Sequence, residues 1–169
     1  MEAASEVRDF PAAARLRQSA FRGAAWGVLG CAGGVFAALL VTAILPPELR
    51  GKSAAEAILQ GRVSAGVAVF LACVFAPLWE TFIGQLLPLE ILRKLKVRPV
   101  LAIALAALLF GFGHVLNGGL AHGLVATVAG TILALLYTRE RAAGVLCAFT
   151  AAAVAHAVNN GIMLLAASV

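Results

Sequence analysis

Long apolar segments separated by short polar ones dominate the hydropathy pattern of the chain. Each is long enough for an α-helix, rising 1.5 Å per residue, to cross the roughly 30 Å hydrocarbon core of a bilayer. The pattern predicts an all-α integral membrane bundle with about five transmembrane helices, at residues 23–45, 63–92, 99–116, 120–138 and 142–168. We expect one transmembrane domain, residues 23–169, after a polar segment, residues 1–22, that is a candidate interfacial helix.

Composition supports a membrane protein and argues against a nucleic-acid partner. Of the 169 residues, 62% are hydrophobic and 12% charged, and the mean hydropathy is +0.98. A soluble domain averages about 45–50% apolar residues. The net charge of +5 does not indicate nucleic-acid binding, because most basic residues flank the apolar runs, where they set membrane orientation.

The distribution of Lys and Arg predicts a cytoplasmic N-terminus and an outer C-terminus. Ten of the 13 basic residues fall at 1–22, 93–98 and 139–141, and the other three fall at 50–62. The composition, rich in Ala and Gly, favours a bacterial inner (plasma) membrane. Val41-Thr42-Ala43 resembles a cleavage site, so a signal peptide stays open as the alternative to the first span.

Glu80 is the only carboxylate that the hydropathy pattern places deep inside an apolar segment, since the other acids lie in or beside polar stretches. An ionisable group at the bilayer centre costs about 3 kcal/mol or more, so it indicates a functional site. The same segment is long and carries Pro77 and Pro88, so we expect a kink, a tilt or an interfacial extension near the acid.

Two other apolar segments carry polar side chains at matching depth. Phe110 and His114, and His156 and Asn160, are spaced by four residues, which places each pair on one helix face. Counted from the predicted inner helix ends, Glu80, His114 and His156 lie about 18, 23 and 21 Å deep. Asn160 lies about one turn further out. We therefore expect these groups in one layer of the bundle.

These residue types suit the activation of water. A carboxylate can accept a proton from water while an imidazole shares or donates one. The second imidazole and the amide can donate hydrogen bonds to the oxyanion that forms when water attacks a carbonyl. A single membrane histidine can instead bond a neighbouring helix, but the grouping with Glu80 favours a site that hydrolyses peptide bonds.

In this arrangement the chain resembles the CPBP family (CAAX protease and bacteriocin-processing, also called Abi), a group of intramembrane glutamic endopeptidases. The family motifs read Glu-Glu-x-x-x-Arg, Phe-x-x-x-His and His-x-x-x-Asn. The chain holds the corresponding stretches in the same order, as Glu80-Thr81-x-x-x-Gln85, Phe110-x-x-x-His114 and His156-x-x-x-Asn160. The second and third motifs match fully, and the first matches at its leading Glu.

The resemblance implies that Glu80 and His114 activate the water and that His156 and Asn160 assist as oxyanion donors. It implies a mechanism without metal or other cofactor, acting on a membrane-anchored peptide or protein. Family substrates range from prenylated C-terminal tails to leader peptides and anchored precursors. Thr81 and Gln85 replace a charged pair; spaced by four, they can bond to each other, and with Phe110 they are candidate supporting residues.

Three further features receive structural interpretations. His122 is expected on the surface of a short outer loop, and Asn117 either caps a helix or touches the site. Gly23, Gly27, Gly30 and Gly34 share one helix face, where close helix packing is favoured over dimerisation.

Two alternatives to a protease stay open. One is a non-catalytic immunity or scaffold protein with the same motifs. The other is a metal- or proton-handling membrane protein that uses Glu80, His114 and His156 as ligands or as a relay.

Overall fold

The protein is an all-α membrane bundle, as the apolar pattern predicts. The computed structural model describes residues 11–51 and 64–167, and this part of the chain contains helices without strands. The longest elements are α1 (Ala12–Ile44), α7 (Pro99–Glu140) and α8 (Val145–Ala167). The shorter ones are α2 (Pro47–Arg50), α4 (Ala65–Phe70), η1 (Leu71–Phe75), α5 (Ala76–Thr81), η2 (Phe82–Leu86), α6 (Leu87–Lys94) and η3 (Arg141–Ala143). Four continuous helical segments of the described chain are long and apolar enough to cross a membrane: 12–44, 65–94, 99–143 and 145–166.

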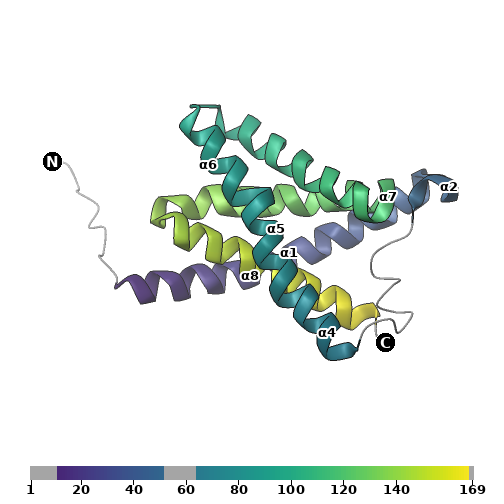
Figure 1. Ribbon diagram of the computed structural model, residues 1–169, viewed down its shortest axis with the longest axis horizontal. Helices are drawn as coiled ribbons and strands as arrows, with labels where there is room; N and C mark the ends of the chain where they lie inside the picture. Colours follow the sequence, from purple (N-terminus) through teal and green to yellow (C-terminus); the bar gives the residue numbers. More distant parts are fainter. Residues whose placement is uncertain (1–10, 52–63, 168–169) are drawn as a thin grey trace.

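The third of these segments contains two of the predicted spans. Gly119 has φ 84° and ψ 179° inside α7, a conformation that only glycine adopts without strain. The chain reverses there, and Figure 1 shows the teal first half of α7 running one way and the green second half returning. Gly130 approaches Phe110, and Gly123 approaches Gly111, so the halves are antiparallel neighbours. Counting them separately gives the five predicted spans.

The polar segment before the first predicted span is joined to it. Residues 12–22 belong to α1 and continue into the span without a break. Residues 1–10 lie outside the described part of the chain. The placement of residues 1–22 at the membrane interface stays a prediction.

The glycine face of α1 packs against α8 at one end and leaves space at the other. A Cβ at Gly23 would overlap the Ala151 carbonyl, and one at Gly27 would lie 2.6 Å from the Ala155 carbonyl oxygen. Around Gly30 the nearest atoms would be 3.9 Å away, and around Gly34 none lies within 4 Å. The first two glycines allow the helix backbones to approach. Gly27 and the last two also line a cavity that is described below.

Two π-helical turns interrupt the helix that carries Glu80. η1 ends two residues before Pro77, and η2 ends two residues before Pro88. A proline has no N–H and its ring clashes with the carbonyl four residues earlier, whereas a π turn bonds each residue to the fifth one along. The distortion expected from the prolines therefore takes the form of two π turns, with α5 and Glu80 between them.

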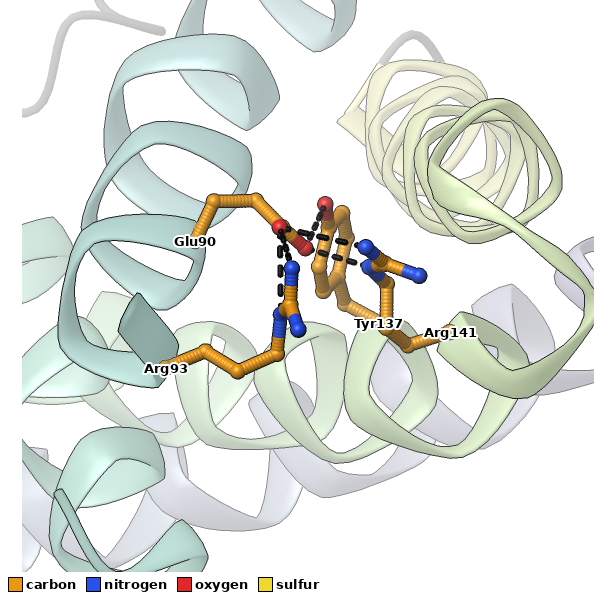
Figure 2. A network of polar contacts seen from close by, with 4 residues as sticks. All are labelled: Glu90, Arg93, Tyr137 and Arg141. Carbon is orange, nitrogen blue, oxygen red and sulfur yellow. Dashed lines mark hydrogen bonds and ion pairs between the residues drawn. The ribbon is translucent and has the colours of Figure 1, made fainter. Parts of the chain in front are cut away.

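Polar clusters join the helices at the end of the bundle that is predicted to be cytoplasmic. Figure 2 shows Glu90 of α6 receiving hydrogen bonds from Arg93, from Tyr137 of α7 and from Arg141 of η3. The Arg93 Nη2 to Glu90 Oε2 distance is 2.8 Å and the Tyr137 hydroxyl lies 3.1 Å from Oε1. This cluster holds α6 against the end of α7.

A second carboxylate at this end is buried, although its sequence neighbours are polar. Glu140 is 3% exposed. Its Oε1 lies 3.0 Å from Arg22 Nη1, and its Oε2 accepts a 2.9 Å hydrogen bond from Ser19 Oγ. Glu140 thus ties the start of α1 to the end of α7.

Candidate functional site

Glu80, His114 and His156 meet between three helices. Glu80 Oε2 lies 3.4 Å from His114 Nε2 and 3.6 Å from His156 Nε2. α5 carries the acid, the first half of α7 carries His114, and α8 carries His156. The two imidazole side chains are mostly enclosed, 19% and 6% exposed, whereas the Glu80 side chain is 35% exposed. The structure therefore brings together the acid and the two histidines that the sequence places at one depth.

The backbone sets the tautomer of His114. Its Nδ1 lies 2.8 Å from the Phe110 carbonyl oxygen. A carbonyl only accepts hydrogen bonds, so Nδ1 carries a hydrogen and Nε2 faces Glu80. A favourable Nε2–Oε2 contact then needs one proton, either on Nε2 or on Oε2. His114 and Glu80 consequently form a pair that shares a proton.

Phe110 holds both imidazoles in place. Its ring centroid lies 4.5 Å from that of His114 and 5.5 Å from that of His156, which it meets edge to face. Such aromatic contacts add about 0.5–1.5 kcal/mol beyond area burial. Because Phe110 contacts His114 through both its ring and its carbonyl, it supports the pair directly.

Thr81 contacts His156 and not Gln85. Thr81 Oγ1 lies 3.3 Å from His156 Nδ1, and both side chains are buried. When His156 turns an Nε2–H toward Glu80, Nδ1 is free to accept from the Thr81 hydroxyl. The expectation that Thr81 and Gln85 bond to each other is wrong. Gln85 instead donates to the Gly130 carbonyl of α7, so the two side chains have separate partners.

Gln85 braces its helix against α7. Its Nε2 donates to the Gly130 carbonyl at 3.3 Å, and the residue is fully buried. Its Oε1 is buried and has no hydrogen-bond partner among the described residues. The position that carries Arg in the family motif is therefore a neutral packing position in this chain.

Asn160 contacts the backbone of η1. Its Nδ2 donates to the Ala72 carbonyl at 3.0 Å, and its Oδ1 accepts from Asn159 Nδ2 at 3.2 Å. Asn160 lines the same cavity as Glu80 and the two histidines. It makes no hydrogen bond to those three within the described residues.

The site opens into a cavity of about 600 Å³. That volume falls in the range of about 300–1,000 Å³ that is usual for ligand pockets. Glu80, His114, His156 and Asn160 contribute polar groups to its wall, as do Thr42, Arg50, His122 and Asn159. The rest is mainly Gly and aliphatic, including Gly30, Gly34, Ala38, Val125, Ile132 and Leu164. The cavity can therefore hold an apolar chain beside the carboxylate.

His122 lies in this cavity, and the prediction that places it on an outer surface loop is wrong. It lies in the first turn after Gly119, and its ring centroid is 5.0 Å from that of His114. Gly119 reverses the chain within one residue, and Gly118 has no side chain where the His122 ring lies. The Gly118-Gly119 pair in the sequence could have predicted this position. Such a tight reversal packs the first turn after Gly119 against the helix that precedes it. Asn117 is exposed and lies outside the cavity lining.

Within residues 11–51 and 64–167, no three or more His, Cys, Asp or Glu side chains are placed to hold a metal ion. The three cysteines, Cys31, Cys73 and Cys147, are free.

Comparison with known proteins gives one match. A family model described as Type II CAAX prenyl endopeptidase Rce1-like matches residues 62–162, more than half of the chain. The matched range includes Glu80, His114, His156 and Asn160. Neither the curated proteins nor the solved structures give a match.

Proposed function

The chain belongs to the Type II CAAX prenyl endopeptidase Rce1-like family, and from this premise we propose that it is an intramembrane endopeptidase of the glutamic type. It hydrolyses a peptide bond in a membrane-anchored or membrane-proximal substrate. One observation carries the proposal: a single carboxylate oxygen, Glu80 Oε2, lies within 3.6 Å of two imidazole nitrogens at the wall of an apolar cavity. A non-catalytic immunity or scaffold protein, which binds without cleaving, does not need a carboxylate placed beside two imidazoles.

In the proposed reaction Glu80 is the general base. With the shared proton on His114, the Glu80 carboxylate accepts a proton from water as the water oxygen bonds to the substrate carbonyl carbon. The carbonyl π electrons move to its oxygen. When this tetrahedral intermediate collapses, the C–N bond breaks and a proton from the Glu80–His114 pair passes to the leaving nitrogen.

His156 is the proposed oxyanion donor. Its Nε2 lies beside the carboxylate that aligns the water, so an N–H there can turn to the oxygen that becomes negative. Thr81 keeps the ring oriented through Nδ1. The resemblance gives the same task to Asn160, but one hydrogen of its amide is held by Ala72.

The cavity suggests the kind of substrate. Its wall, mainly of Gly and aliphatic side chains, suits an apolar segment that enters from the membrane. The protein is an integral membrane protein with four apolar helical segments in its described part. We place it in a bacterial inner membrane, where anchored precursors and leader peptides are available substrates.

The test is cleavage of candidate membrane peptides by the purified protein in liposomes, with products identified by mass. Glu80→Gln should lower the rate about 100- to 10,000-fold, the contribution of a general base. Glu48→Gln is the matched control, because Glu48 is exposed in α2 and lies outside the cavity lining. Full processing by the Glu80→Gln variant would overturn the proposal.

A further inference from the structure

The π turn before Pro77 leaves one backbone carbonyl without a helical donor. The Ala76 N–H bonds to the Leu71 carbonyl, five residues back. The carbonyl of Ala72 would next receive the N–H of residue 77, but Pro77 has none. With no helical donor in reach, the Ala72 carbonyl is open to a hydrogen bond from another helix.

Asn160 supplies that partner. Its Nδ2 lies 3.0 Å from the Ala72 carbonyl oxygen. Its Oδ1 accepts from Asn159, so both ends of the amide are engaged and its orientation is defined. Because the contact is to the backbone, it depends on the break at Pro77 and not on a side chain of η1.

This contact bears on where Glu80 points. A π turn holds one more residue than an α turn, so its presence rotates every side chain that follows it. α8 contacts the helix at two points on either side of the acid: Asn160 with the Ala72 carbonyl, and His156 with Thr81. Glu80 lies between these two points along the chain.

We propose that Asn160 is a positioning residue that satisfies the carbonyl left open by Pro77, and that it thereby fixes the π turn that aims Glu80 at the histidines. Its catalytic meaning rests on the proposed function, whereas the hydrogen bond and its dependence on Pro77 do not. The competing assignment is direct oxyanion donation, in which the amide acts on the substrate and Pro77 is irrelevant.

A double-mutant cycle separates the two assignments. Pro77→Ala introduces an N–H that can reach the Ala72 carbonyl, so it should make the Asn160 amide dispensable. The variants are Asn160→Ala, Pro77→Ala and the pair, with Asn117→Ala as the control because Asn117 is an exposed amide outside the cavity. Each is purified in detergent and measured for Tm, and for kcat and KM on a peptide that the wild type cleaves.

With proline at 77, Asn160→Ala should lower Tm and lower kcat up to about 100-fold, as misplacement of a reacting group does, with KM nearly unchanged. With alanine at 77, the same substitution should cost less than about threefold in kcat and leave Tm unchanged. Asn117→Ala should match its parent protein in each background, the wild type with proline at 77 and Pro77→Ala with alanine at 77.

An equal loss of kcat in both backgrounds contradicts the inference and favours oxyanion donation. A lower yield of folded protein with full kcat contradicts it as well. If the wild type cleaves no peptide and behaves like Glu80→Gln, the proposed function fails, and the Tm values alone then decide the inference. In that case, an Asn160→Ala substitution that lowers Tm as much with alanine at 77 as with proline overturns the inference.

Discussion

Glu80 and Glu140 are two carboxylates enclosed by the same bundle, and their partners differ in kind. The Glu140 side chain is 2% exposed, and its two oxygens are bound by the guanidinium of Arg22 and the hydroxyl of Ser19. Glu80 is 35% exposed toward a cavity, and its Oε2 faces two imidazoles. Arginine keeps its charge at every accessible pH, whereas histidine exchanges protons near neutrality. A membrane carboxylate is available for chemistry when its partners can exchange protons and a cavity reaches it.

Removing one partner from each carboxylate should give the largest contrast. His114→Ala takes away the group that shares a proton with Glu80, and we expect kcat to fall about 100- to 10,000-fold with a small change in Tm. Arg22→Gln takes away the cation beside Glu140, and we expect a lower Tm with kcat of the folded protein nearly unchanged. Cleavage rates per folded protein and thermal melts in detergent measure both. Loss of activity with Arg22→Gln comparable to that with His114→Ala would erase the contrast.

Filling the cavity should have an intermediate effect. Gly34 has no atom within 4 Å of a Cβ position and lines the cavity, so Gly34→Leu should fold normally and lower kcat/KM about tenfold or more by excluding substrate. Gly27→Leu is the matched change on the same face, where a Cβ would lie 2.6 Å from the Ala155 carbonyl oxygen. That variant should lose folded protein instead. If Gly34→Leu lowered kcat/KM equally for short and long peptides, the substrate would not occupy this part of the cavity.

The smallest effect is expected at the third histidine. His122 contacts the His114 ring and forms no hydrogen bond or ion pair with Glu80 among the described residues, so we expect it to act mainly through His114. His122→Ala should lower kcat about fivefold, a coupling of roughly 1 kcal/mol between adjacent groups. Kinetics of His122→Ala, His114→Ala and the double variant check this. Independent effects of the two substitutions would mean that His122 has a separate role.

Much of the fold follows from the local hydropathy pattern, because each helix must be apolar over its own length to cross a bilayer. The depth argument also brought Glu80, His114 and His156 to one level, since depth depends only on position along each helix. Both inferences use distances along single helices, which the residue numbers contain.

The contacts that the pattern did not predict depend on what another part of the chain contributes. Glu140 is buried because Arg22 and Ser19 reach it from α1, more than a hundred residues earlier. His122 enters the cavity because one glycine adopts a positive φ. Thr81 and Gln85 have separate partners because α8 brings His156 to one and α7 brings the Gly130 carbonyl to the other. The hydrophobic periodicity of a single segment does not predict any of these three features.

The most direct test places Glu80→Gln and Glu140→Gln side by side, with cleavage in liposomes and unfolding in detergent measured on the same preparations. Glu80→Gln should lose cleavage about 100- to 10,000-fold and keep its stability. Glu140→Gln should keep the cleavage rate of the folded protein and lose about 1.5–3 kcal/mol of stability, since hydrogen bonds to a buried charge are weakened. If Glu80→Gln cleaves like the wild type, or if both variants lose activity only in proportion to unfolding, Glu80 is not the base and the account is wrong.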